Sequence, residues 1–409
     1  MRLTNEFDNA MPVAPLKLIA LSSAEGLGKT VNDYLASYRK NAHNVHVKDP
    51  AFQGYCEKNY LVNFSTPRFG SGEGKGVMNE SVRGKDIYIL VDVCNHHLTY
   101  TVNGYTNHMS PDDHYQDLKR VIAAINGKAH RITVIMPFLY EGRQHRRSAR
   151  ESLDCAYALS ELYGMGVNDI VTFDAHDPRV ANSSPLSGFD NFSPNVQFVQ
   201  TLLTHEKDLI IDKEHTVVIS PDEGALERAV YFANLFHVDT GMFYKRRDYT
   251  KVVGGKNPIV AHEFLGDNID GKDVIIVDDM ISSGESMLDT AKQLKAMNAK
   301  RVFICTTFGL FTNGLDAFDK AYENCYFDKV ITTNLTYRDP QLMNRPYYLE
   351  ADMSAFLANI IDFMNHDVSL SNALTPTEKI QKILDLYNAR EDIDFLDTMK
   401  INNISCNCS

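Results

Sequence analysis

Short apolar runs alternate with longer amphipathic segments through the first half of the chain. Four runs predict strands: Leu16–Leu21, Asp86–Val93, Ile132–Pro137 and Ile170–Phe173. The segments between them predict helices: Lys29–Lys40, Tyr115–Ile125 and Ser148–Tyr163. In the second of these, Leu118, Val121, Ile122 and Ile125 recur at the spacing of one helix face. Such alternation of strand and helix is typical of βαβ units.

The same alternation starts again in the second half. It predicts strands at Thr216–Ser220, Asp273–Val277, Val302–Thr306 and Val330–Thr333, and helices at Gln197–Leu203, Gly224–Leu235, Ser286–Met297 and Thr377–Asn388. The restart indicates an α/β fold with two domains, each a mainly parallel sheet flanked by helices. A stretch rich in Ser, Pro, Gly and Asn, 184–193, predicts the joint between them. We expect domains at 1–187 and 188–350, and C-terminal helices and a tail at 351–409 that pack on the first domain.

Composition narrows the class of protein. With 41 basic and 53 acidic residues among 409, the net charge of −12 argues against a nucleic-acid binder. No apolar run approaches the roughly 18 residues of a membrane span, and the N-terminus lacks a hydrophobic signal core. Seven cysteines form no disulfide framework. We therefore expect a cytoplasmic protein that binds neither nucleic acid nor membrane.

The strongest chemical signal is the segment 274–286, in which an apolar strand runs into Asp278 and Asp279 and then into a loop of small residues before a helix. Backbone amides and hydroxyls of such a loop, with the helix N-terminus behind them, suit a phosphate. The paired carboxylates suit vicinal ribose hydroxyls. Either Asp alone would fit an ordinary strand end and a Ser-capped helix, but their coincidence with the loop favours a ligand site.

This segment resembles the phosphoribosyl-pyrophosphate loop of type I phosphoribosyltransferase folds, which implies two phosphoribosyltransferase-like domains. The resemblance implies that Asp278 and Asp279 hold the ribose hydroxyls. It also implies that the following loop residues hold the sugar 5-phosphate: Ser282, Ser283, Gly284, Glu285 and Ser286. The superfamily includes orotate and purine transferases as well as ribose-phosphate pyrophosphokinases, so the loop alone leaves the reaction open.

Two further segments resemble the ATP-binding parts of the ribose-phosphate pyrophosphokinase family. Residues 143–147 resemble its Arg-Gln-Asp-Arg core, with Arg143, Gln144 and Arg146 retained and His145 in place of Asp. Arg side chains suit phosphate through their bidentate fork. Residues 68–73 resemble its Phe-x-Asp/Asn-Gly-Glu segment, with Ser71 at the third position. The resemblance implies that Phe69 stacks on adenine and that Glu73 contacts it or orients the loop, in the site of a neighbouring subunit.

Three more motifs occur in the order expected for this family. Residues 174–177 resemble its Asp-Leu-His-Ala segment, and Ser220–Asp222 matches its Ser-Pro-Asp segment. The resemblance implies that His176 and Asp222 place a catalytic Mg²⁺, and that Asp222 also contacts ribose. Tyr244–Arg247 matches the base of its mobile catalytic loop, where Lys245 and Arg247 would neutralise charge during transfer. Residues 248–257 would form a flexible lid.

The chain is therefore identified as a long, divergent member of the ribose-phosphate pyrophosphokinase family. The resemblance implies an enzyme that uses ATP, ribose 5-phosphate and Mg²⁺ to make 5-phosphoribosyl 1-diphosphate and AMP. It also implies a homo-oligomer with shared ATP sites. Two alternatives stay open. One is a phosphoribosyltransferase that consumes phosphoribosyl diphosphate, and the other is a non-catalytic regulatory paralogue that binds active synthetase subunits.

Some motifs are rejected as sites. Ser23–Thr30 resembles a Walker A loop but has Ser where the pattern requires Gly, so we expect an ordinary helix entry. Cys406 and Cys408 have no further nearby Cys or His for a zinc site. Two segments, 41–68 and 96–114, are expected to be insertions.

Overall fold

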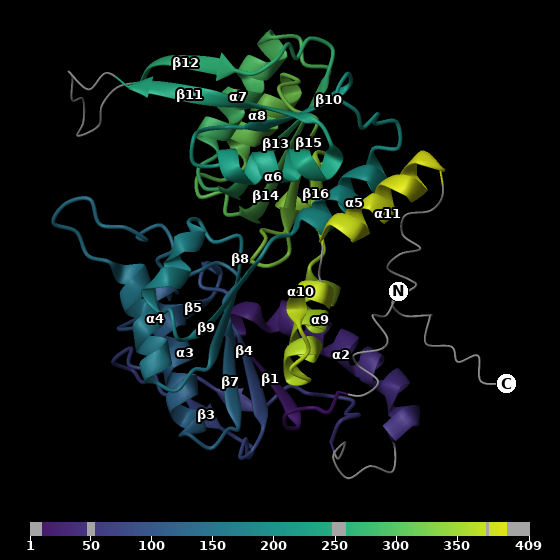
Figure 1. The fold of residues 1–409 in the computed structure, drawn as a ribbon. Helices are drawn as coiled ribbons and strands as arrows, with labels where there is room; N and C mark the ends of the chain where they lie inside the picture. Colours follow the sequence, from purple (N-terminus) through teal and green to yellow (C-terminus); the bar gives the residue numbers. More distant parts are fainter. Residues whose placement is uncertain (1–9, 47–53, 248–258, 374–375, 391–409) are drawn as a thin grey trace.

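The structure is a computed structural model that describes residues 10–46, 54–247, 259–373 and 376–390. They form two α/β units, each built on its own sheet (Figure 1). The parallel sheets flanked by helices confirm the expected fold class. Across the described residues, no helix has both the length and the apolar character needed to span a membrane.

The first unit is a fully parallel sheet with strand order β1-β4-β7-β8-β9. Its strands are β1 (Leu16–Ala20), β4 (Asp86–Leu90), β7 (Arg131–Ile135), β8 (Asp169–Phe173) and β9 (Gly188–Phe192). Its helices are η1 (Ser22–Ala24), α2 (Glu25–His46), α3 (Pro111–Ile125), α4 (Asp154–Gly164) and η3 (Pro178–Ser183). Two small hairpins complete it: β2 (Phe64–Ser65) with β3 (Val77–Met78), and β5 (Thr99–Val102) with β6 (Tyr105–His108).

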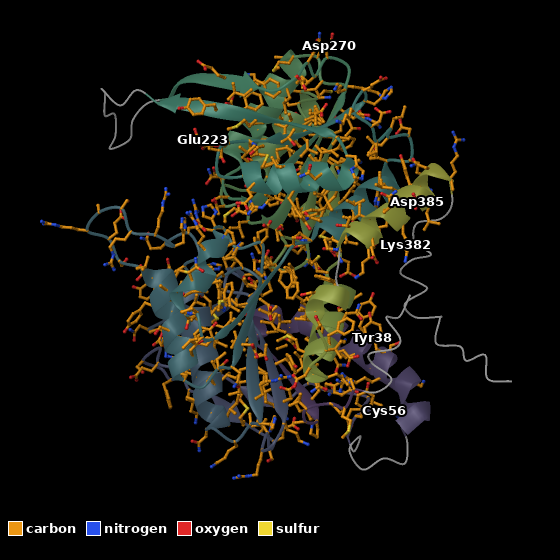
Figure 2. All side chains as sticks on the ribbon, viewed as in Figure 1. Tyr38, Cys56, Glu223, Asp270, Lys382 and Asp385 are labelled. Atoms are coloured by element: carbon orange, nitrogen blue, oxygen red, sulfur yellow. The ribbon has the colours of Figure 1, made fainter. Side chains whose placement is uncertain are left out.

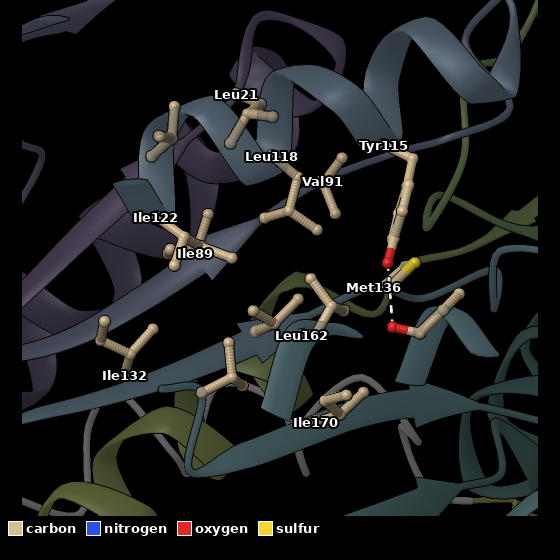
Figure 3. Close-up of a cluster of buried hydrophobic side chains, with 14 of the residues drawn as sticks. Leu21, Ile89, Val91, Tyr115, Leu118, Ile122, Ile132, Met136, Leu162 and Ile170 are labelled. Carbon is tan, nitrogen blue, oxygen red and sulfur yellow. Dashed lines mark hydrogen bonds between the residues drawn. The ribbon is translucent and has the colours of Figure 1, made fainter. Parts of the chain in front are cut away.

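The core of this unit forms because the helices turn one apolar face to the sheet. Figure 3 shows Leu118 and Ile122 of α3 lying over Ile89 of β4, and all three are buried. Each such side chain contributes about 1.5–3 kcal/mol on burial. The Tyr115 hydroxyl donates a 2.9 Å hydrogen bond to the Ala158 carbonyl, which ties α3 to α4.

The second unit is a seven-stranded sheet with order β12-β11-β10-β13-β14-β15-β16. Only β11 and β12 pair antiparallel within it. Its strands are β10 (Thr216–Ser220), β11 (Asp239–Arg247), β12 (Ile259–Leu265), β13 (Asp273–Ile281), β14 (Arg301–Gly309), β15 (Lys329–Thr333) and β16 (Tyr348–Ala351). Its helices are α5 (Asn195–His205), α6 (Leu226–Phe236), α7 (Glu285–Ala296), α8 (Asp316–Glu323) and η4 (Leu342–Asn344).

The C-terminal helices divide between the two units. Helix α9 (Ser354–Asn365) packs on α2, where Arg39 Nε donates a 2.8 Å hydrogen bond to Asp362, and the short α10 (Leu370–Ala373) follows it. Figure 2 shows Tyr38 on this side of the molecule. Helix α11 (Pro376–Asn388) packs instead on α5 of the second unit, with Ile380, Ile383 and Leu384 buried there.

Helix α9 thus lies on the first unit, whereas α11 lies on the second and not on the first unit as expected. The three buried side chains of α11 recur at helical spacing, so they form a stripe that matches the apolar face of α5. In Figure 2, Lys382 and Asp385 lie on the opposite, exposed side of α11.

Two local expectations also change. The stretch 184–193, taken as the joint between domains, contains β9, which pairs with β8, so the chain leaves the first sheet only after Phe192. Helix α4 begins at Asp154, so residues 143–153 form a loop that projects from the first unit (Figure 1).

The Walker-like segment is a helix entry as expected. A Cβ on Gly28 would lie 2.3 Å from that of Ala20, which shows how closely α2 approaches β1.

The carboxyl ends of the two sheets face each other. The Phe138 ring, after β7, meets the Phe308 ring of β14 edge-on with centroids 5.1 Å apart. Asp92, after β4, accepts a 2.6 Å hydrogen bond from the backbone N–H of Tyr337 beyond β15. Strand-end loops of both units therefore meet at one place, which is where ligands of parallel α/β sheets bind.

Candidate active site

The acid pair lies at the end of β13 and reaches the first unit. Asp279 is 4% exposed, and its Oδ2 lies 2.7 Å from Nδ1 of His176, which follows β8. Asp278 is less buried, and its Oδ1 accepts the backbone N–H of Asp279 at 2.8 Å. Residues 103 positions apart in sequence are thus in direct contact. This contact joins the acid pair of the second unit to a strand-end motif of the first.

A cation that is largely shielded from water lies behind the pair. Arg228 of α6 donates from Nε to Asp174 Oδ1 at 2.7 Å, and its Nη1 lies 3.7 Å from Asp278 Oδ1. Thr307 of β14 donates a 2.6 Å hydrogen bond to the second oxygen of Asp174. Asp174 follows β8, so this network is a second link between the units.

Burial and neighbouring charges shift the pKa values of Asp278 and Asp279 in opposite directions. Burial, and then the adjacent Asp279 charge, raise the pKa of Asp278 well above its usual value. Burial opposes ionisation of Asp279, but the hydrogen bond from His176 and the charge of Arg228 lower its pKa overall. The same hydrogen bond raises the pKa of His176. Asp279 therefore carries the negative charge and Asp278 holds a proton more readily.

The loop after the pair is shaped by a glycine. Gly284 has φ +83°, and a Cβ there would lie 2.3 Å from the Phe318 ring. It precedes α7, whose first residue, Glu285, is exposed. Ser283 Oγ accepts from the Glu285 N–H at 3.5 Å. Residues 282–286 thus present backbone amides at a helix N-terminus, an arrangement suited to an anion.

The expected metal residues are not joined by a described contact. Asp222 Oδ1 accepts the backbone N–H groups of Gly224 and Ala225 at 2.9 and 3.3 Å, whereas His176 binds Asp279. In the part of the chain that the structure describes, no group of three or more His, Cys, Asp or Glu could hold a metal unaided. A divalent cation bound through one or two of these side chains would take its remaining ligands from water or from substrate oxygens.

The segment expected to bind ATP lies in the loop between β7 and α4. Gln144 Nε2 donates to the Ser152 carbonyl at 2.9 Å, while Arg143 and Arg146 are exposed. His145 Nε2 lies 3.2 Å from Asp177 Oδ2, so the loop is fastened to the segment that follows β8. The cationic side chains thus extend from a loop with a fixed base.

The Phe69–Glu73 segment is a tight turn on the first unit. The Phe69 N–H donates to the Glu73 carbonyl at 2.7 Å, and Ser71 Oγ donates to the Glu73 carboxylate at 2.8 Å. The Phe69 ring is 54% exposed. Arg68 stacks on Tyr100 of the β5–β6 hairpin at 4.3 Å, so this insertion supports the turn.

Lys245 and Arg247 lie at the end of β11, where they pair in register with His262 and Ile259 of β12. The lid expected at 248–257 lies outside the described residues, as do Cys406 and Cys408.

Sequence reasoning assigned no role to Asp174, Arg228 or Thr307. Asp174 could have been found, because it follows a predicted strand in the same motif as His176. Arg228 carried no usable signal, since an Arg on an amphipathic helix is ordinarily solvated.

A parallel sheet whose central strand ends in two carboxylates, followed by a glycine-bent loop at a helix N-terminus, defines a phosphoribosyltransferase-type α/β domain. Residues 197–332 match the sequence model described as the phosphoribosyl transferase domain. Residues 16–166 match the model of the N-terminal domain of ribose phosphate pyrophosphokinase.

Proteins of similar sequence are named ribose-phosphate pyrophosphokinases. The chain is 30% identical over 312 residues to the ribose-phosphate pyrophosphokinase of Shewanella oneidensis, covering 74% of this chain and 88% of that protein. It is 28% identical over 319 residues to that of Pasteurella multocida, covering 77% and 92%. The crystal structure of phosphoribosylpyrophosphate synthetase from Mycobacterium smegmatis shares the fold, with TM-score 0.67 and 22% identity over 86% of this chain and 99% of that one. The chain belongs to the ribose-phosphate pyrophosphokinase family of diphosphate-transferring enzymes, as the motifs predicted.

Proposed function

We propose that the protein transfers the β,γ-diphosphoryl group of ATP to the anomeric hydroxyl of ribose 5-phosphate, giving 5-phosphoribosyl 1-diphosphate and AMP for nucleotide biosynthesis. The observation that carries this proposal is the 2.7 Å contact between His176 and Asp279. It brings the strand-end motifs of the two units to one point, as a reaction between two bound substrates requires.

The second unit would hold the sugar. Residues 282–286 would bind the 5-phosphate through backbone amides and the hydroxyls of Ser282, Ser283 and Ser286. Asp278 and Asp279 would accept hydrogen bonds from the ribose hydroxyls. The anomeric oxygen would then bond to the β-phosphorus of ATP as the bond to the α-phosphate oxygen breaks. The hydroxyl proton is released and AMP leaves.

The first unit would hold ATP. Arg143, Gln144 and Arg146 would bind the nucleotide, and Phe69 would stack on adenine beside Glu73. The exposed ring of Phe69 supports a site completed between subunits, so we propose a homo-oligomer. Lys245 and Arg247 would neutralise charge as the diphosphoryl group moves, because such transfer depends mainly on positioning and charge stabilisation.

Mg²⁺ fits the donors present when the substrates are included. His176 and Asp222 would place it, and substrate phosphates would complete its coordination, since Mg²⁺ is commonly bound through few protein ligands plus phosphates. When bound, the ion supplies charge neutralisation along the phosphates. The low number of cysteines supports a reducing, cytoplasmic location as part of this proposal.

One assay tests the proposal against both alternatives. Purified protein is given ATP, Mg²⁺ and ribose 5-phosphate, with and without inorganic phosphate, and AMP and phosphoribosyl diphosphate are followed. Equal amounts of both products are expected. Consumption of phosphoribosyl diphosphate only when a nucleobase is added would indicate a transferase instead. No AMP from folded protein would overturn the enzymatic proposal and favour the regulatory paralogue, to be tested by pull-down of an active synthetase.

A further inference from the structure

Among the positions of the first unit that differ from the motifs the chain resembles, two have side chains that can hydrogen-bond to each other. His145 stands where the Arg-Gln-Asp-Arg core has Asp, and Asp177 stands where the Asp-Leu-His-Ala segment has Ala. The first segment follows β7 and the second follows β8, which are neighbouring parallel strands. Their following loops therefore lie side by side.

The two exceptional residues are partners in the structure. His145 Nε2 lies 3.2 Å from Asp177 Oδ2, and the two side chains are only 14% and 10% exposed. Arg179 also holds this carboxylate, with its Nε 2.9 Å from Asp177 Oδ1 and 3.1 Å from Oδ2. The contact is largely shielded from water, so a change that leaves either partner without the other removes a hydrogen bond that water does not readily replace.

The pair adjoins the reacting centre. The rings of His145 and His176 lie 5.6 Å apart between centroids, and His176 contacts Asp279. A direct sequence of contacts thus runs from the ATP-binding loop, through the segment after β8, to the acid pair of the second unit.

Neither exceptional residue fits without the other. An Asp at position 145 would place a carboxylate against Asp177, and like charges at such a distance are strongly unfavourable. An Ala at position 177 would leave a shielded His145 without its acceptor. With His at position 145 and Asp at position 177, the site still has one carboxylate, but it comes from the segment after β8 instead of the segment after β7.

We propose that His145 is a positioning residue that fixes the ATP-binding loop to the β8 segment through Asp177, and that the two departures are one compensated exchange. This inference rests on the proposed function. The neighbouring residues Arg143, Gln144 and Arg146 would then be held in register with His176. Loss of the pair should weaken ATP binding and leave the sugar side unchanged.

The test is a double-mutant cycle with His145→Asp, Asp177→Ala and the combined variant. We measure kcat, KM for ATP and for ribose 5-phosphate, the Kd for Mg-ATP by calorimetry without sugar, and the melting temperature. His145→Asp should raise KM and Kd for ATP about tenfold and Asp177→Ala about three- to fivefold, while the combined variant returns to within about threefold of the parent, because contacting residues do not behave additively.

A matched pair serves as control. His215 Nδ1 lies 2.7 Å from Asp212 Oδ1, exposed on the second unit. His215→Asp and Asp212→Ala should leave both KM values unchanged. His145→Gln, which keeps an amide donor near the position of Nε2, should restore most of the ATP affinity lost in His145→Asp.

Three results would overturn the inference: additive losses in the combined variant, an equal rise in KM for ribose 5-phosphate, or loss of ATP affinity matched by the control pair. Failure of the proposed function is a separate outcome. In that case the parent protein makes no phosphoribosyl diphosphate, but the pattern of Mg-ATP Kd values still decides whether the exchange is compensated.

Discussion

The two facing sheet edges share an architecture and differ in how their functional groups are held. On the second unit, Asp278, Asp279 and Gly284 lie on or next to one strand and are buried or tightly packed. On the first, Arg143 and Arg146 extend from a loop and are exposed. A small, rigid sugar phosphate suits a preformed cradle. A long, flexible triphosphate suits cations that can adjust to it.

The difference predicts different outcomes of substitution. Changes at the edge of the second unit should affect stability and turnover together, because its groups are closely packed and Asp279 also contacts the first unit. Changes at the exposed edge should affect ATP alone.

Arg228→Met should reduce the free energy of unfolding by about 3 to 5 kcal/mol, because it leaves the largely shielded carboxylate of Asp174 without its cation. Denaturant unfolding measures the change, and Arg228→Lys should lose less. A loss below 1 kcal/mol in the Met variant would show that the network behind the acid pair contributes little.

Asp92 is the opposite case, because it is a buried group at the sheet edge of the first unit. Burial raises its pKa to about 7, so the folded state binds a proton that the unfolded state releases near pH 4. This contribution to stability is therefore complete below about pH 4 and is lost as the pH rises through about 7.

Asp92→Asn does not titrate at this position. The stability of the parent relative to this variant should therefore fall by about 3 to 4 kcal/mol from pH 4 to pH 7, at 1.36 kcal/mol per pKa unit. Urea unfolding at several pH values measures the difference. Parallel stability curves for the two proteins would contradict the raised pKa.

Asp279→Asn should lower kcat by about 10²- to 10³-fold, because the charge facing His176 and the sugar is removed from a buried site. Steady-state kinetics with both substrates measures this effect. Asp270→Asn is the matched control, since that side chain is exposed at the far end of the second unit (Figure 2). A loss under threefold would remove Asp279 from the proposed machinery.

Gly284 lies in the proposed phosphate loop and Gly28 in the Walker-like segment, so substitution at the two positions compares these segments. A Cβ would meet Phe318 at Gly284 and Ala20 at Gly28, both at 2.3 Å, so either Gly→Ala change should cost about 1 to 3 kcal/mol by overpacking. Only Gly284→Ala should also raise KM for ribose 5-phosphate. An equal rise from Gly28→Ala would reinstate the Walker-like segment as a ligand site.

The sequence predicted local structure better than contacts between distant parts. Strand Thr216–Ser220 agrees with β10 at both ends because its apolar run is bounded by polar residues. Strand β9 was missed, since none of its residues is fully buried and the pattern shows no apolar run. The acid pair could be predicted from adjacent residues, whereas its contact with His176 depends on how two sheets meet. The stripe on α11 predicted a helix but did not identify its partner.

The path of the chain has a consequence for how the two units stay together. The backbone passes from the first unit to the second after β9, returns before α9, and passes to the second again between α9 and α11. Three covalent connections therefore join the units. A protease that cuts after β9 divides the chain into two fragments, but α9 belongs to the second fragment and packs on α2 of the first, so this packing would keep the fragments associated.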